Sequence, residues 1–351
     1  MEVSNYFWGM IRIDLRSDTL TLPSPQMREA MFSAEVGDDV FNEDPSINAL
    51  QEYTAAFFGK EAALFCSSGT QTNQIAINAQ TRPGDEVICS NMAHVYLYEG
   101  GGIAKNSGCS VRLIEGDRGR ITAAQVQANV NSREHDYLPY TSLVCLEDTV
   151  NKGGGAIYDF NEIKAIRQVC DNNGLNLHLD GARLFNALVE TKIDAKEYAS
   201  YFDTISICLS KGLGAPVGSL VLGSKEFITR AHRLRKSYGG GLRQGGFLAA
   251  AGLYALKHNI ERLKVDHAHA RAIGQALQPL SWVADVLPVV TNIVIFQVRE
   301  GLAASDIVAK LAKQEIHCFT FGPDKIRFVT HLDFTSDHLM ALIDRLGRIS
   351  I

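Results

Sequence analysis

Short apolar runs alternate with amphipathic stretches along most of the chain. The runs have the length and the bounding turns of strands, while the stretches between them repeat apolar residues at helical spacing. The run 204–209 is apolar on both faces, as in a buried parallel sheet. Predicted strands are 62–66, 86–89, 110–114, 142–147, 175–180, 204–209 and 219–222, and predicted helices are 24–34, 46–58, 71–80, 122–131, 159–172 and 225–236. This order predicts an α/β fold with a mainly parallel sheet covered by helices on both faces.

The pattern changes after two further predicted helices, 247–256 and 260–280. The remaining chain reads as a smaller α+β unit. Its predicted strands are 284–287, 292–298, 317–321 and 325–329, and its predicted helices are 304–314 and 336–348. We therefore expect an N-terminal arm and large domain over 1–243, with a strand or extended arm at 11–15, and a small domain over 244–351.

Composition narrows the class of protein. The 351 residues are 46% hydrophobic and 21% charged, which is typical of a globular protein. The net charge of -5 gives no reason to expect nucleic acid or an anionic membrane as a partner. Seven cysteines without a CxxC pair predict buried thiols in a reducing compartment, and no metal site. The start lacks the pattern of a signal peptide and no apolar run is long enough to span a membrane, so we expect a cytoplasmic location.

An acid and a lysine follow two neighbouring predicted strands. Asp180 ends the strand 175–180, and Lys211 comes directly after 204–209. The carboxyl ends of parallel strands are where open α/β sheets bind ligands. A carboxylate can keep a pyridine nitrogen protonated and a lysine can form a Schiff base, so the pair suits pyridoxal 5′-phosphate. Taken alone, an aspartate after a strand is more often a helix cap, and a Ser-Lys-Gly segment is more often part of a surface loop.

Two glycine-containing segments suggest a phosphate site. Ser-Ser-Gly-Thr at 67–70 joins a strand to a helix, where backbone N–H groups bind anions, although most such turns bind nothing. The segment 238–246 carries Arg243 among glycines and could complete that site or form a linker. His94 follows another strand on the same side, and we expect its ring to stack on the cofactor, although a lone histidine is more often a core residue.

These motifs together resemble the low-specificity threonine aldolases. This group lies within the aromatic amino acid β-eliminating lyase/threonine aldolase family of fold-type I pyridoxal phosphate enzymes. The resemblance begins at residue 13 and covers nearly all of the chain that follows. The segments that carry it are 13–19, 35–40, 59–65, 68–70, 177–183, 209–212, 214–219, 239–244 and 327–331.

The resemblance implies a role for each matching residue. Lys211 would be the Schiff-base lysine and Asp180 the partner of the pyridinium. His94 would stack on the ring and help to move the proton of the β-hydroxyl. The phosphate would be held by Gly69, Thr70 and Arg243, with Lys236 reaching a neighbouring subunit, and the substrate carboxylate by Ser17, Arg183 and Arg327. The resemblance also implies a homotetramer built as a dimer of dimers, with sites completed across the interface.

The implied reaction is cleavage of L-threonine or L-allo-threonine to glycine and acetaldehyde. The chain departs from the family at Phe41, Tyr137 and Val150, and we expect Tyr137 to contact the hydroxyl side of the substrate and affect diastereomer preference. Two other activities on the same scaffold remain open, β-elimination and alanine racemisation. A non-catalytic binding module is a further alternative, but it gives no purpose to the Asp180 and Lys211 pair.

Overall fold

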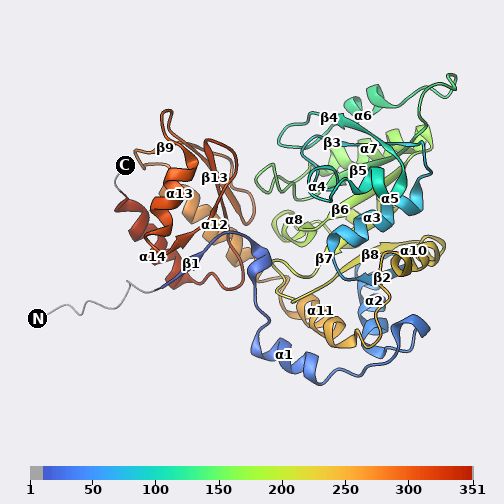
Figure 1. Ribbon diagram of the computed structural model, residues 1–351, viewed down its shortest axis with the longest axis horizontal. Helices are drawn as coiled ribbons and strands as arrows, with labels where there is room; N and C mark the ends of the chain where they lie inside the picture. The colour runs from blue at the N-terminus through green and yellow to red at the C-terminus, as the bar shows by residue number, and fades with distance from the viewer. Residues whose placement is uncertain (1–10, 350–351) are drawn as a thin grey trace, which may run out of the picture. The chain divides into compact units, whose positions relative to one another are not determined.

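A seven-stranded sheet forms the centre of the larger part of the chain. The computed structural model describes residues 11–349, which divide into a larger unit, 22–261, and a smaller unit formed by 11–21 and 262–349. Figure 1 follows the chain through both units. Each unit is described by itself.

The sheet of the larger unit is mostly parallel. Its strands are β2 (Ala62–Cys66), β3 (Glu86–Ser90), β4 (Ser110–Ile114), β5 (Thr141–Glu147), β6 (Asn176–Gly181), β7 (Thr204–Cys208) and β8 (Ser219–Gly223). They lie in the order β2-β8-β7-β6-β5-β3-β4, and only β8 is antiparallel to its neighbours. The prediction of a mainly parallel sheet is confirmed.

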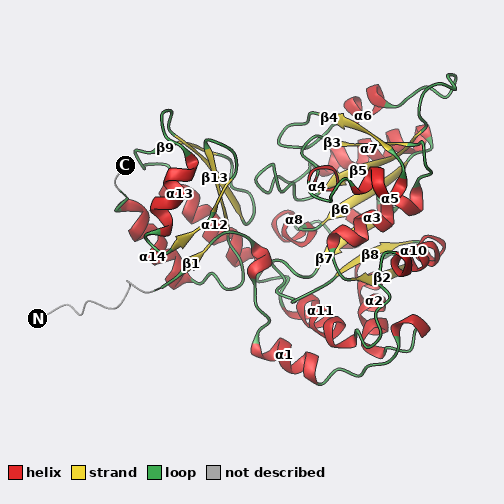
Figure 2. Cartoon of the chain, in the orientation of Figure 1, coloured by secondary structure: helices red, strands yellow, loops and turns green. Residues whose placement is uncertain are grey.

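Helices cover this sheet (Figure 2). Those predicted from the sequence are α1 (Pro25–Phe32), α2 (Pro45–Phe58), α3 (Gly69–Gln80), α6 (Ala123–Asn129), α7 (Phe160–Asn173), α10 (Lys225–Ser237) and α11 (Gly246–His258). Shorter helices complete the unit: α4 (His94–Leu97), α5 (Gly102–Ser107), α8 (Leu184–Thr191), α9 (Ala195–Ser200) and a 3-10 turn, η3 (Asp39–Phe41). The segment after β3, which carries a glycine run, holds α4 and α5, whose four and six residues are too few for a periodic signal.

Alternation along β6 decides which of its side chains face α3. Leu177 and Leu179 point to one face of the sheet, and His178 and Asp180 to the other. Asn73 of α3 is hydrogen-bonded to both His178 and Asp180. All four β6 residues are buried, so the polar pair depends on partners from the helix.

The smaller unit is an antiparallel sheet packed on helices. Its sheet has the order β12-β13-β10-β9, and β1 pairs in parallel with β11 beside it. The strands are β1 (Ile13–Asp14), β9 (Val283–Val286), β10 (Ile293–Val298), β11 (Ile316–His317), β12 (Phe319–Thr320) and β13 (Lys325–Val329). The helices are α12 (Leu263–Leu277), α13 (Ala304–Ala312), α14 (Ser336–Gly347) and the 3-10 turn η2 (Asp18–Leu20). Ile13 and Leu15 are buried in the same core as Phe296 and Phe328.

The two units divide the chain differently from the predicted division at residue 243. Residues 11–21 belong to the smaller unit because β1 pairs with β11. Helix α11 belongs to the larger unit, where it packs against α1 and α2. Residues 1–10 of the predicted arm lie outside the described residues. No helix between residues 11 and 349 is both long and apolar enough to cross a membrane.

A buried ion pair fixes the loop before α2 to the end of α10. The guanidinium of Arg235 is 1% exposed; its Nη2 lies 2.7 Å from Asp39 Oδ2, and its Nη1 donates to the carbonyl of Phe65 at the same distance. The adjacent acid, Asp38, pairs with Arg243, whose side chain is 55% exposed. Asp39 therefore makes a buried ion pair, and its sequence neighbour Asp38 makes an exposed one.

We expect Asp39→Ala to lower the free energy of unfolding by about 3–5 kcal/mol, because it leaves the Arg235 charge buried without a partner. Asp38→Ala is the matched control and should cost only about 1 kcal/mol, since its pair is exposed. Urea unfolding of both variants measures the difference. Equal losses would contradict the role given to the buried pair.

Candidate active site

The carboxyl ends of the parallel strands bring the predicted Asp180 and Lys211 to the same edge of the sheet. Asp180 lies opposite Ser206 in the pairing of β6 with β7, and Lys211 follows the end of β7. The turn after β7 is fixed by a hydrogen bond from Gly214 N to Lys211 O. The neighbouring strand β5 ends at Glu147, which lies opposite Asp180. Two carboxylates, those of Asp180 and Glu147, and the amine-bearing residue Lys211 therefore lie at the same edge of the sheet.

Asp180 is held by a donor at each oxygen. Asn73 Nδ2 donates to Oδ2 over 3.0 Å, and Ala182 N donates to Oδ1 over 3.1 Å. The carboxylate is 2% exposed. A buried acid held in one orientation suits a partner for a protonated ring nitrogen, which is the role predicted for it.

The start of α3 has the geometry of an anion site. Ser68 Oγ caps the helix by accepting from Gln71 N, and Thr72 N bonds to Ser68 O, which leaves the N–H groups of Gly69 and Thr70 for a ligand. Below Gly69, Ser219 Oγ is buried and has no hydrogen-bond partner among the described residues. Exposed N–H groups and this unpaired hydroxyl fit a phosphate group.

The glycine-rich segment lies beside this helix start. Gln71 Nε2 donates to Tyr238 O over 3.4 Å, and a side chain at Gly240 would collide with Gln71. Arg243, predicted to bind phosphate, pairs instead with Asp38, with Nη1 2.9 Å from Oδ2. Lys236 is an exposed residue in the last turn of α10. Phosphate binding by these two cations stays a prediction.

His94 begins α4 and is held at two points. Its backbone N donates to Glu147 Oε2 over 2.8 Å, and its Nδ1 lies 3.0 Å from Glu99 Oε1. Burial alone would lower the pKa of His94, but the Glu99 hydrogen bond and the charges of Asp180, Glu99 and Glu147 outweigh it and raise the pKa. This favours the imidazole as a proton acceptor.

Three carboxylates lie around His94. Burial, reinforced by the charge of Asp180, raises the pKa of Glu147 to about 7. Ligand atoms of His94, Glu99 and Asp180 lie within 4.8 Å of one another, a spacing that would also suit a metal ion. The amide of Asn73, however, donates to both Glu99 and Asp180, so protein hydrogen bonds already use these oxygens.

The remaining predicted residues fall in several places. Arg183 is buried in the larger unit, with Nη1 3.4 Å from Asn151 Oδ1. Ser17 and Arg327 belong to the smaller unit, where Arg327 Nη2 donates to the carbonyl of Arg16 over 3.3 Å, beside Ser17. Their binding of a substrate carboxylate stays a prediction.

Tyr137 does not lie at this edge of the sheet in the same chain. It precedes β5, whose opposite end carries Glu147, and it is 76% exposed and stacked on His135 at 5.2 Å between ring centroids. The segment before β5 extends from the sheet in Figure 1. The predicted contact with substrate therefore requires a second copy of the chain.

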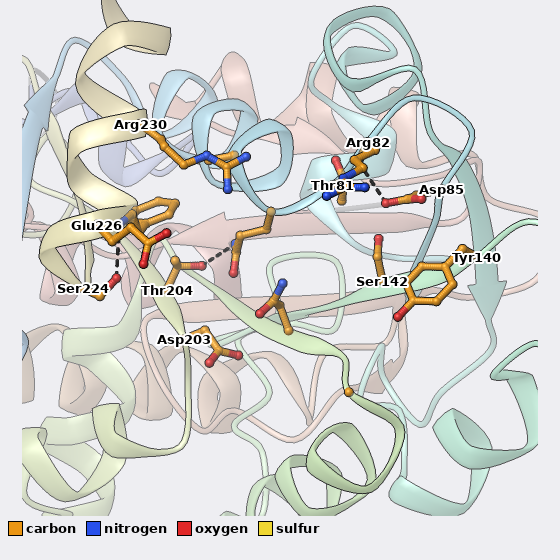
Figure 3. A pocket seen from close by; sticks show the side chains of 15 residues that line it. Thr81, Arg82, Asp85, Tyr140, Ser142, Asp203, Thr204, Ser224, Glu226 and Arg230 are labelled. Atoms are coloured by element: carbon orange, nitrogen blue, oxygen red, sulfur yellow. Dashed lines mark hydrogen bonds between the residues drawn. The ribbon is translucent and has the colours of Figure 1, made fainter. Parts of the chain in front are cut away.

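A cavity lies at the other edge of the sheet, where the parallel strands begin. It has a volume of about 820 Å³ and includes Ser142, Asn176 and Thr204 at the starts of β5, β6 and β7. Figure 3 shows Arg82 and Arg230 lining it together with acidic side chains, which are Asp85, Asp203 and Glu226. Charges of both signs indicate no single class of ligand, and the predicted catalytic residues lie at the opposite ends of the strands.

Five residues of the candidate active site were not predicted: Asn73, Glu99, Glu147, His178 and Ser219. Glu147 ends a predicted strand next to the one that ends at Asp180, and that position was an available signal. Asn73, Glu99 and His178 become recognisable only through contacts between α3, β6 and the segment after β3.

Comparisons with known proteins agree with this geometry. The sequence pattern of the β-eliminating lyase family matches residues 14–301. The chain is 42% identical over 328 residues to a low-specificity L-threonine aldolase of Escherichia coli, covering 93% of this chain and 96% of that one. It is 41% identical over 325 residues to a probable low-specificity L-threonine aldolase of Arabidopsis thaliana, covering 91% and 92%.

A solved structure gives the same result for the fold. Threonine aldolase of Leishmania major superposes with a TM-score of 0.84 at 21% identity, covering 96% of this chain and 99% of that one. The chain therefore belongs to the β-eliminating lyase family, and its fold is that of the fold-type I enzymes that use pyridoxal 5′-phosphate.

Proposed function

We propose that this protein is a low-specificity threonine aldolase, which cleaves L-threonine and L-allo-threonine to glycine and acetaldehyde. The observation that carries the proposal is the position of Lys211, Asp180 and His94 after the carboxyl ends of parallel strands of one sheet, next to the start of α3. Relatives with this named activity match over more than nine tenths of their length.

The residues of the site fit pyridoxal 5′-phosphate. When bound, it supplies an aldehyde for the substrate amine and a ring that accepts the electrons of the breaking Cα–Cβ bond. Lys211 would hold the aldehyde, Asp180 the ring nitrogen, and the N–H groups of Gly69 and Thr70 the phosphate. The unpaired hydroxyl of Ser219 below Gly69 supports this placement of the phosphate.

His94 would perform the proton transfer of the cleavage. Nδ1 lies 3.0 Å from Glu99 Oε1, and a proton on Nδ1 that is donated to Glu99 would leave Nε2 with its lone pair in the neutral ring. Removing the β-hydroxyl proton at Nε2 lets the oxygen form the carbonyl of acetaldehyde as the Cα–Cβ bond breaks. The buried guanidinium of Arg183 suits the substrate carboxylate, whose fixed orientation would decide which bond breaks.

We also propose a cytoplasmic homo-oligomer. All seven cysteines are free and buried, which suits a reducing compartment. Assembly would give a role to Tyr137, whose exposed ring lies before β5 and away from the site of its own chain. The family resemblance implies two pairs of subunits, and a neighbouring subunit would then supply this segment and receive Lys236.

A substrate panel tests the activity. We expect equal amounts of glycine and acetaldehyde from L-threonine and L-allo-threonine when the purified protein is given pyridoxal 5′-phosphate. L-Serine and L-alanine serve as controls for the two other activities on this scaffold. Pyruvate as the main product from serine would indicate a β-eliminating lyase, and racemisation of alanine without cleavage of threonine would indicate a racemase; either result would refute the proposal.

Variants of Tyr137 test the oligomeric site. We expect Tyr137→Phe to change the ratio of kcat/KM for threonine to that for allo-threonine by about 5-fold, because one hydrogen bond to substrate is worth about 1 kcal/mol. Tyr140→Phe is the matched control, since Tyr140 lies in the same segment and contacts Arg133. An unchanged ratio in Tyr137→Phe would show that this side chain does not contact substrate.

A further inference from the structure

The buried carboxylate of Glu99 lies within hydrogen-bond distance of three side chains at the active site. Asn73 Nδ2 and His94 Nδ1 lie 2.9 and 3.0 Å from Oε1, and Gln74 Nε2 donates to Oε2 over 2.6 Å. The Glu99 side chain is 0% exposed. A buried carboxylate with this many donors is fixed in orientation before any ligand binds.

The orientation of Asn73 follows from its neighbours. Two carboxylates, those of Asp180 and Glu99, accept from its Nδ2, so the amide must direct its NH₂ group toward both. Its Oδ1 then faces His178 Nε2 at 3.1 Å, and His178 must donate from that nitrogen. Burial lowers the pKa of His178 to about 4, so the ring is neutral and this tautomer is fixed.

Gln74 is fixed in the same way. Its Oε1 accepts from Asn106 Nδ2 over 3.1 Å, so its Nε2 is the group available to Glu99. An amide at position 99 would present an NH₂ group to a neighbouring donor. The site therefore requires a carboxylate at this position, with two acceptor oxygens and no donor.

We infer that Glu99 is the positioning residue of His94: it holds the proton of the imidazole on Nδ1 and thereby leaves Nε2 as the base of the reaction. The inference deepens the proposed function and depends on His94 being that base. Glu99 acts through His94 and needs no contact with the substrate.

The charges around His94 come from several elements. Glu99 lies between α4 and α5, Asp180 on β6 and Glu147 on β5, and all three favour the protonated ring. Tyr98, from the same segment as His94, packs against the imidazole with 5.5 Å between centroids. Removing the Glu99 charge leaves the other two acids in place, so the pKa of His94 should fall.

The direct test is nitrogen NMR of the histidine rings, with His94 assigned by the signal lost in His94→Asn. We expect the neutral His94 ring of the parent to carry its proton on Nδ1. In Glu99→Gln the pKa of His94 should be lower and the Nδ1–H form less populated. Exposed Glu115→Gln is the matched control and should resemble the parent. If the neutral His94 ring of the unmodified protein carries its proton on Nε2, the inference is wrong whatever the variants show.

The pH profile of threonine cleavage gives a second readout. The base must be neutral to accept a proton, so kcat/KM falls on the acid side of the His94 pKa. We expect Glu99→Gln to move the acid side of this profile to lower pH, because the pKa of His94 falls. We also expect it to reduce the maximal kcat/KM by about 100-fold, because a well-positioned base contributes a factor of this order. Glu99→Asp keeps the charge and should recover part of the maximal kcat/KM.

The outcomes separate the inference from the proposed function. If Glu99→Gln keeps the parent pH profile and the parent histidine signals, the positioning role is wrong even though threonine is cleaved. If His94→Asn retains full activity, the base is another group and the role of Glu99 in the reaction is wrong. If the parent does not cleave threonine at all, the proposed function fails, while the NMR result still decides how Glu99 orients His94.

Discussion

The amide of Asn73 bridges two buried acids, and the chemistry of the site depends on this arrangement. Asp180 and Glu99 both accept from Asn73 Nδ2, at 3.0 and 2.9 Å. Carboxylates this close together in a buried site would repel each other and take up protons without donors between them. In the proposed mechanism, the amide bridge would let Asp180 hold the cofactor ring while Glu99 orients His94.

The fold explains how these residues meet. Parallel strands place Glu147 and Asp180 opposite each other at one edge, and the turn after β7 adds Lys211 there. Alternation along β6 directs His178 and Asp180 to the face where α3 supplies Asn73. The same helix begins at Gly69, where its N–H groups would hold the phosphate, so α3 would support both ends of the cofactor in the proposed function. Short helices after β3 then bring His94 and Glu99 to this group.

The sequence was sufficient to predict the parts that local pattern determines. Buried strands have apolar runs, so the sheet and the places of Asp180 and Lys211 followed from strand ends. Glu99 had no such signal, because its position depends on two turns around the short helices α4 and α5. The place of residues 11–21 depends on pairing between β1 and β11, which are far apart in the chain. Tyr137 was assigned from resemblance, and in a single chain its ring is exposed, so its contact with substrate stays a prediction.

The most direct test of the account is to locate the lysine that holds the cofactor. The protein is loaded with pyridoxal 5′-phosphate, reduced with borohydride and digested, and the peptides are measured by mass spectrometry. The account predicts that the phosphopyridoxyl group is on Lys211, and that Lys211→Ala loses both this label and the visible absorption of the bound cofactor. A label on another lysine, such as Lys236, or an unchanged label in Lys211→Ala, would contradict it.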